Sequence, residues 1–185
     1  MHKVIDKLIN QDQIGYIKGR FIGETIRTID DIMFLTDKHK INGFITLIDF
    51  EKAFDSIEWT FLFKCLKAFN FGDSFLDWIK ILYTDIKSCV TNNGYYSECF
   101  NLSRSIRQGC PISALLFILV AEILAISIRT NKNIHGLQFN TKTNRTYTIV
   151  QLADDTCVIV WCSRPCKVCA MFTCSIVFPV LCVVL

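Results

Sequence analysis

Two short stretches decide the fold class: Ile48-Asp49-Phe50-Glu51-Lys52-Ala53-Phe54-Asp55 and Leu152-Ala153-Asp154-Asp155. Each stretch places acidic residues at the end of an apolar segment that is predicted to be a β-strand. An unpaired carboxylate at such a position is costly when it is buried. The cost is removed if the acids share metal ions. Carboxylates that converge from separate strands on two Mg²⁺ ions are the arrangement used in two-metal phosphoryl transfer.

The composition bounds the class of protein. A chain of 185 residues, of which 51% are hydrophobic, is long enough to bury the core of one domain. The net charge of +3 is a weak basic bias and does not by itself indicate nucleic-acid binding. The N-terminus carries no apolar signal segment. We therefore expect an intracellular protein, nuclear or cytoplasmic and not secreted, with free thiols.

The composition changes near Trp161. Six of the ten cysteines lie at position 157 or later, and the segment after Trp161 carries only two charged residues. We predict two parts, residues 1–161 and an unrelated apolar, Cys-rich tail over 162–185. The cysteine spacing fits no standard zinc site, so we expect no zinc. Residues 168–185 are just long enough for a membrane span. A tail anchor stays open as an alternative, although we favour a segment without an evolved fold.

Hydrophobic periodicity predicts helices interleaved with antiparallel strand pairs, which indicates an α+β fold with a small antiparallel sheet backed by helices. The apolar run over 44–50 is typical of a strand buried on both faces. Asp55 with Glu58 fits a capping box at a helix start, and Asn92-Asn93-Gly94 predicts a hairpin turn. The expected helices cover residues 24–39, 59–69, 75–86 and 114–129, and the expected strands cover 44–50, 87–91, 95–102, 134–139, 145–151 and 156–161.

The acids of the two stretches are the candidate site. Both follow segments that belong in one sheet, and a strand end beside a hairpin turn lets the acids meet. Asp49 and Asp154 are the candidate catalytic metal ligands, and Asp155 is the candidate helper that orients the site or binds the second ion. Each has a structural alternative, because Asp is common in hairpin turns and Asp49 can cap the following segment. Glu51 is expected to point away, since neighbours in a strand alternate faces.

Four blocks follow one another along the chain: Asp12-Gln13-Ile14-Gly15-Tyr16-Ile17-Lys18-Gly19-Arg20; Asp49 to Ser56; Arg107-Gln108-Gly109-Cys110-Pro111-Ile112-Ser113; and Leu152-Ala153-Asp154-Asp155. In this order and spacing they resemble the reverse transcriptase of non-LTR (long-interspersed-element type) retrotransposons. The resemblance covers residues 4 to 160. The last block departs only at Leu152, where the family usually has Phe, and either side chain fills an apolar strand position.

The resemblance implies an RNA-directed DNA polymerase with a right-hand palm, incomplete fingers and no thumb. It implies that Asp49, the Phe50 carbonyl and Asp154 hold Mg²⁺ (or Mn²⁺). It further implies an RNA template, a DNA primer and deoxynucleoside triphosphates as partners. Family polymerases carry basic fingers strands before these blocks and a thumb after the Asp-Asp turn, neither of which this chain shows. We therefore expect a fragment that is inactive as it stands. A non-enzymatic retrotransposon remnant, with at most weak nucleic-acid binding, stays open as an alternative.

The resemblance also implies contacts to the nucleotide. Phe54 would lie under the incoming sugar and exclude a ribose 2′-OH, with Gln108 and Gly109 beside the nucleotide. A core aromatic is the structural alternative for Phe54. Arg20 and Arg107 are candidate nucleic-acid contacts. The alternative for Arg20 is an exposed Lys-Gly-Arg turn, and the alternative for Arg107 is a solvated loop arginine.

Overall fold

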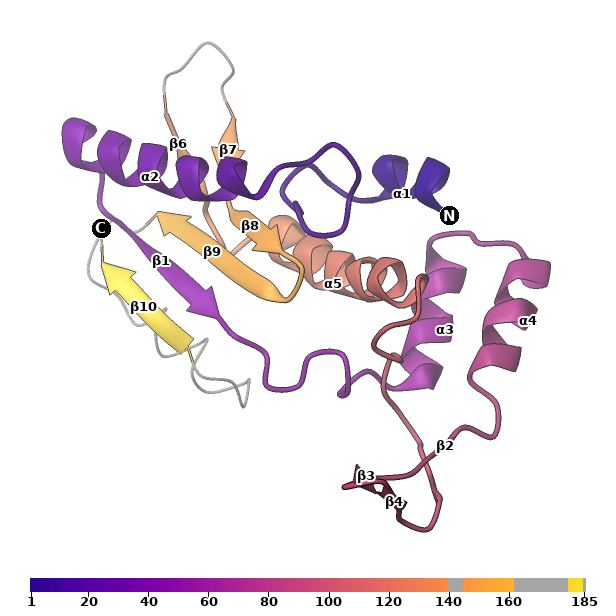
Figure 1. The fold of residues 1–185 in the computed structure, drawn as a ribbon. Coiled ribbons are helices and arrows are strands. Elements are labelled where there is room, and N and C mark those ends of the chain that lie inside the picture. Colours follow the sequence, from indigo (N-terminus) through magenta and orange to yellow (C-terminus); the bar gives the residue numbers. More distant parts are fainter. Residues whose placement is uncertain (140–144, 162–179, 185) are drawn as a thin grey trace. The chain divides into compact units, whose positions relative to one another are not determined.

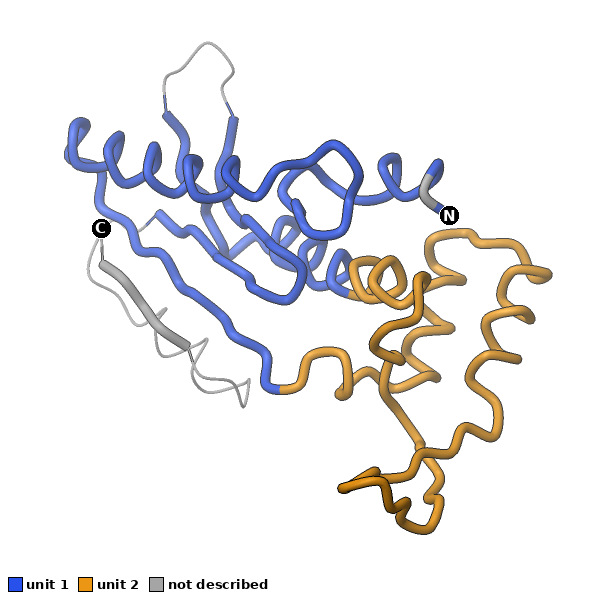
Figure 2. Tube along the Cα trace, viewed as in Figure 1, with its two compact units in different colours: residues 1–51, 121–185 blue, residues 52–120 orange. Residues whose placement is uncertain are grey.

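A computed structural model of the chain describes residues 1–139, 145–161 and 180–184 (Figure 1). The helices are α1 (His2–Leu8), α2 (Ile22–His39), α3 (Trp59–Ala68), α4 (Asp73–Leu82) and α5 (Ser113–Thr130). The strands are β1 (Gly43–Ile48), β2 (Lys87–Ser88), β3 (Thr91–Asn92), β4 (Tyr95–Tyr96), β5 (Phe100–Asn101), β6 (Leu137–Gln138), β7 (Thr146–Tyr147), β8 (Ile149–Leu152), β9 (Asp155–Trp161) and β10 (Val180–Val184). The chain divides into two compact units, residues 1–51 with 121–185 and residues 52–120 (Figure 2).

The first unit is built on a four-stranded sheet in the order β10-β1-β9-β8. All three strand pairs are antiparallel. β1 lies inside the sheet and is buried at every position but one, Leu47, which is 39% exposed. The prediction of a strand buried on both faces is thus confirmed. The strand ends at Ile48, so Asp49 follows it directly.

Helices cover both faces of this sheet. On one face, Ile32 of α2 packs with side chains that include Ile45 and Ile159. On the other face, Ala125 and Ile128 of α5 pack with side chains from β1, β8 and β9 (Figure 1). Alternate residues of β1 therefore enter separate cores, which explains its nearly continuous apolar sequence.

The apolar face of α2 differs from the predicted one. Ile26 and Met33, which the periodicity placed on that face, are 59% and 45% exposed. Ile32 and Thr36 are the buried residues of the helix. Because α2 carries apolar residues around much of its circumference, the partner sheet and not the helix sequence decides which of them are covered.

α5 is apolar almost all round, and the prediction that it is buried is confirmed by side chains such as Leu116 and Ile118. Among the described residues it is the one helix whose length and mean hydropathy of 2.0 suit a membrane span, and 56% of that window is buried. A core helix meets the same test. Residues 168–179, most of the predicted tail anchor, lie outside the described residues, and 180–184 form β10, which pairs with β1.

The second unit contains α3, α4, the strand pairs β2–β5 and β3–β4, and the first part of α5. Leu62 and Leu66 of α3 and Ile79 of α4 are buried. The predicted hairpin turn is confirmed, because β3 pairs with β4 around Asn93 and Gly94, whose φ angles are +48° and +83°. Positive φ at both loop positions is typical of a type I′ turn.

The predicted capping box is wrong. Glu58 occupies the N-cap position of α3, and no side chain hydrogen-bonds there. Asp55 lies in a turn before the helix, and its carboxylate accepts a hydrogen bond from the Ser105 hydroxyl at 2.9 Å. A local pattern cannot anticipate this bond, since its partner is fifty residues away in the chain.

The predicted hairpin around residues 140–144 is present as the pair β6 and β7, although its loop lies outside the described residues. The predicted boundary between 161 and 162 remains a prediction. β10 falls within the predicted tail and pairs with β1 from Phe44 opposite Val184 to Ile48 opposite Val180.

Candidate functional site

Asp49 and Asp155 meet where two paired strands end. β1 ends at Ile48, directly before Asp49, and β9 begins at Asp155. Ile48 pairs with Thr156 in antiparallel register. The next pair in this register, one residue after Ile48 and one residue before Thr156, places Asp49 opposite Asp155. Residues directly opposite each other share one face of the sheet, with Cβ atoms about 4.5–5.5 Å apart. The sheet therefore brings together one carboxylate from each acidic stretch.

Asp154 lies in the tight turn that joins β8 to β9. Leu152 pairs with Asp155, so Ala153 and Asp154 form a two-residue hairpin loop. Ala153 has a φ of +57°, and this left-handed conformation costs a residue with a Cβ roughly 1–2 kcal/mol. Asp154 is thus held beside Asp155 by a turn whose backbone is unfavourable by itself.

Asp155 lies in the electrostatic field of the other two acids. The pKa of the Asp155 carboxyl is raised by desolvation first, and then by the negative charges of Asp154 and Asp49. The charged form of Asp155 is therefore disfavoured in the folded chain. A bound cation relieves repulsion of this kind because it places a positive charge among the carboxylates.

The donor atoms here fit a hard divalent cation, because such ions take carboxylate and carbonyl oxygens. The candidate donors are the carboxylates of Asp49, Asp154 and Asp155 and the carbonyl of Phe50. In the part of the chain that the structure describes, no three His, Cys, Asp or Glu side chains stand in ready-made metal-holding geometry. The oxygen donors and the negative charge of these residues fit a divalent cation, and the ligand set stays a prediction.

A cavity of about 720 Å³ opens beside two of the acids. Its walls come from α2, β1, β8 and β9 and are mainly apolar. The lining residues are Thr25, Ile29, Leu47, Ile48, Asp49, Val150, Leu152, Asp155, Thr156 and Cys157. Asp49 and Asp155 therefore border open space, as a site that binds ions must.

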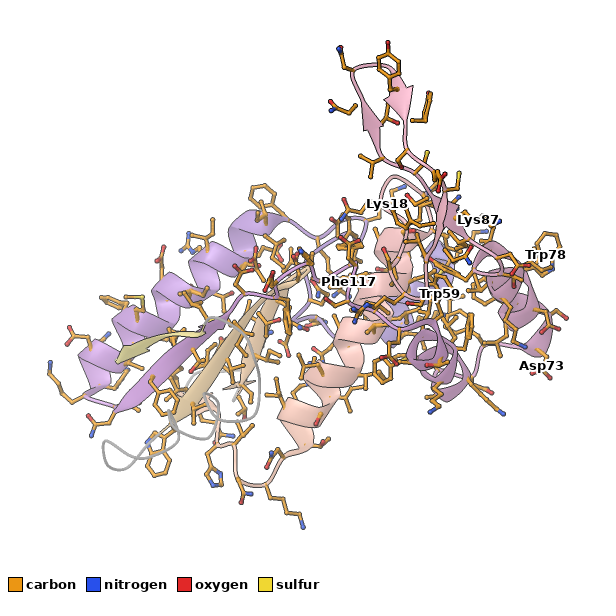
Figure 3. The ribbon with its side chains drawn as sticks, turned by 90° about the horizontal axis from the view of Figure 1, so that it is seen from below. Lys18, Trp59, Asp73, Trp78, Lys87 and Phe117 are labelled. Carbon is orange, nitrogen blue, oxygen red and sulfur yellow. The ribbon has the colours of Figure 1, made fainter. Side chains whose placement is uncertain are left out.

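The predicted nucleotide contacts lie in the second unit. Phe54 is half-buried, and its ring stacks on Phe117 with the centroids 4.3 Å apart (Phe117 is labelled in Figure 3). Gln108 and Gly109 are exposed, and Gly109 has a φ of +83°, a conformation that favours glycine. The stacking agrees with the structural alternative for Phe54, and its role in excluding ribose stays a prediction.

Arg20 is engaged within its own loop. Its guanidinium donates hydrogen bonds to the backbone carbonyls of Ile9, Asn10 and Gln13. These bonds shape the segment between α1 and α2, a structural role that differs from the exposed turn expected as the alternative for Arg20. Arg107 is exposed. A nucleic-acid contact by either arginine stays a prediction.

Sequence reasoning missed Gln13, which is buried against the Asp154 turn with 1% of its surface exposed. Its Oε1 accepts hydrogen bonds from the backbone N–H groups of Ala153 and Gly15, both at 2.8 Å. Its Nε2 donates to the Ala153 carbonyl at 3.1 Å. Gln13 stands in the first of the four sequence blocks. That position marks it as part of the resemblance, but it does not indicate a contact with the Asp154 turn.

The acidic strand ends and the order of the blocks agree with comparisons to known proteins. Residues 1–169 match the family described as reverse transcriptase (RNA-dependent DNA polymerase), and the chain belongs to this family. Members of this family generally use divalent metal ions and bind an RNA template. The predicted resemblance is confirmed, since the curated relatives come from non-LTR retrotransposons.

Two of these relatives are the transposon TX1 uncharacterized 149 kDa protein of Xenopus laevis and the Pol polyprotein of the type-2 element R2DM of Drosophila melanogaster. Each is 28% identical to this chain, over 137 and 122 residues respectively. The matches cover 74% and 65% of this chain, but 10% and 12% of the relatives. The chain thus spans about a tenth of the length of these proteins.

Solved structures of telomerase from Candida tropicalis share the fold. The superposition on the telomerase in complex with the TWJ fragment of telomeric RNA covers 100% of this chain and 33% of the telomerase chain, with a TM-score of 0.65 and 12% identity. The superposition on an apo telomerase truncated from the C-terminal domain covers 87% of this chain and 34% of the telomerase chain, with a TM-score of 0.55 and 12% identity. The expected polymerase fold is confirmed at this level, and the division into palm and fingers stays a prediction.

Proposed function

We propose that this chain is the catalytic core segment of an RNA-directed DNA polymerase that adds deoxynucleotides to the 3′-hydroxyl of a DNA primer on an RNA template. The observation that carries the proposal is the meeting of Asp49 with Asp155, next to Asp154, at the ends of paired strands. The register that brings them together lies inside the region that matches the reverse transcriptase family. In this proposal the first unit supplies the palm sheet.

The chain's own residues would divide the work. Asp49, Asp154 and the Phe50 carbonyl would hold two Mg²⁺ ions, and Asp155 would balance the charge beside them. When bound, the ions supply activation of the primer hydroxyl and neutralise charge on the departing pyrophosphate. Phe54 would select deoxynucleotides by excluding a 2′-OH, and Gln108 and Gly109 would lie along the nucleotide.

The 185-residue chain purified by itself is expected to lack polymerase activity. Holding primer, template and triphosphate in reacting geometry supplies on the order of 7–11 kcal/mol of a barrier reduction. The related telomerase chains are about three times as long as the part that this chain covers. Intact carboxylates cannot replace the positioning that the remaining parts of a polymerase provide.

The direct test uses a chimaera in which this chain, with β10 included, replaces the matching segment of the Drosophila R2 polyprotein. RNA-templated, Mg²⁺-dependent primer extension is expected, and Asp49→Asn or Asp154→Asn should abolish it. Asp30→Asn is the matched control, because Asp30 is an exposed acid of α2 in the same unit. Extension that survives either site substitution would refute the proposed function. Extension by the purified 185-residue chain, lost in Asp154→Asn, would show that the expected inactivity is wrong.

A further inference from the structure

The segment between α1 and α2 runs beside β8, the strand that leads into the Asp154 turn. Ile14 N donates to Gln151 O, and Gln151 N donates to Asp12 O, each at 2.8 Å. These two bonds form a parallel bridge between Gln13 and Gln151. The start of the first sequence block therefore joins the edge of the sheet that carries the acids.

Gln13 holds the backbone of Ala153 from both sides. Its carboxamide accepts from Ala153 N–H and donates to the Ala153 carbonyl, so it bonds the two peptide groups that flank a residue with φ of +57°. A rotation of Ala153 out of this conformation breaks at least one of these bonds. The buried oxygen and nitrogen of Gln13 would then be left without them, which is unfavourable.

Gly15 packs closely against Ala153 as well. A Cβ on Gly15 would lie 2.4 Å from the Ala153 nitrogen and 2.8 Å from its Cα. Only glycine permits such a close approach of two backbones. The Gly15 N–H also donates to Oε1 of Gln13, so the two positions act on Ala153 together.

Ion pairs anchor this segment to the rest of its unit. The carboxylate of Asp12 lies 2.8 Å from the Arg145 guanidinium and 3.5 Å from that of Arg129 in α5. Arg129 also pairs with the buried Glu122 of the same helix. Asp12, the residue before Gln13, is therefore anchored to α5, and this anchoring restrains the position of the Gln13 carboxamide.

We propose that Gln13 is a positioning residue of the acidic site, which orients Asp154 by holding the turn conformation of Ala153. This inference rests on the proposed function and deepens it. Asp154 follows Ala153 directly, so a change in the Ala153 backbone swings the Asp154 carboxylate away from Asp49 and Asp155. In this role Gln13 acts through the backbone of Ala153 and not by contact with an ion or a substrate.

The test uses the full 185-residue chain and two measurements: Mn²⁺ affinity by electron paramagnetic resonance, and amide hydrogen exchange at Ala153 by NMR. Gln13→Met keeps the side-chain length and removes all three hydrogen bonds. Exchange at Ala153 should accelerate, and the Mn²⁺ dissociation constant should rise about tenfold, as for other residues that orient metal ligands. Thr36→Val is the control, because it removes a buried hydroxyl that bonds only within α2, and it should leave both quantities unchanged.

Two further variants keep the test decisive if Gln13→Met does not fold. Gln13→Glu retains an oxygen acceptor for the Ala153 and Gly15 amides, so exchange at Ala153 should be slower than in Gln13→Met. Gly15→Ala presses a methyl group on Ala153 and should weaken Mn²⁺ binding while Gln13 is intact. Wild-type exchange at Ala153 in Gln13→Met, or wild-type Mn²⁺ affinity in both Gln13→Met and Gly15→Ala, would overturn the inference.

The outcome separates this inference from the proposed function. If Asp154→Asn binds Mn²⁺ as tightly as the wild type, the proposed metal site fails. Exchange at Ala153 in Gln13→Met measures separately whether Gln13 holds the turn, so a failure of the metal site is distinguished from a failure of these hydrogen bonds.

Discussion

Asp49→Asn should stabilise the chain at neutral pH in the absence of metal, although it removes a candidate ligand. Asp49 lies opposite Asp155 in the extended register of β1 and β9. Two charges roughly 5 Å apart repel by about 0.8 kcal/mol in water and by about 3 kcal/mol at an effective dielectric constant of 20. Both side chains are exposed, so the lower value applies. We expect a gain of about 0.5–1 kcal/mol in the free energy of unfolding.

The pH dependence of this gain has a definite sign. The pKa of Asp155 is raised above its ordinary value of 3.8, in part by the charge of Asp49. The repulsion is absent well below pH 3.8, where Asp155 is protonated in the folded and in the unfolded chain. It grows as the pH rises through the folded-state pKa of Asp155. The advantage of Asp49→Asn should therefore vanish in acid and be complete at neutral pH.

Urea unfolding of the wild type, Asp49→Asn and Asp30→Asn, each in acid below pH 3.8 and at neutral pH, measures the difference in the free energy of unfolding. Asp30→Asn removes the same formal charge from an exposed position on α2 and should change stability little. Added Mg²⁺ should stabilise the wild type, since a ligand that binds only the folded state raises the free energy of unfolding, and should not stabilise Asp49→Asn. A less stable Asp49→Asn at neutral pH without metal, or an equal gain in Asp30→Asn, would refute the reasoning.

Three further outcomes are expected. Phe54→Val in the R2 chimaera should increase ribonucleotide incorporation, since a smaller side chain admits the 2′-OH; unchanged sugar discrimination would mean that Phe54 only stacks on Phe117. Truncation after Trp161 removes β10 and exposes the edge of β1, so size-exclusion chromatography should show association and the urea midpoint should fall; unchanged behaviour would support an unrelated tail. Burial raises the pKa of Cys157 from 9.0 to about 12, so its contribution to stability is intact below pH 9.0 and falls as the pH rises toward 12. The stability of the wild type relative to Cys157→Ala should decrease over that range, and a constant difference in urea unfolding would contradict the shift.

Local sequence patterns determine a large part of the fold. The apolar run of β1, the Asn93–Gly94 turn and the all-round apolar α5 each depend on residues close in sequence, and each is present. The acids that end the strands can also be recognised, because a carboxylate after an apolar strand is unusual wherever the chain goes. The predicted apolar face of α2 was wrong at Ile26 and Met33, although Ile29 packs against the core, and the predicted capping box at Asp55 was wrong. Both depend on which distant segment packs against a residue, and periodicity does not contain that information.

The tertiary structure alone decided how the site is assembled. The pairing of Ile48 with Thr156 determines that Asp155, and not Asp154, lies opposite Asp49. Gln13 reaches Ala153 across 140 positions of sequence, and no local signal marks a glutamine for that contact. The physical reason is the same in both cases. Strand register and long-range hydrogen bonds are chosen by the joint packing of segments far apart in the chain, whereas helix and strand propensity is a property of neighbours.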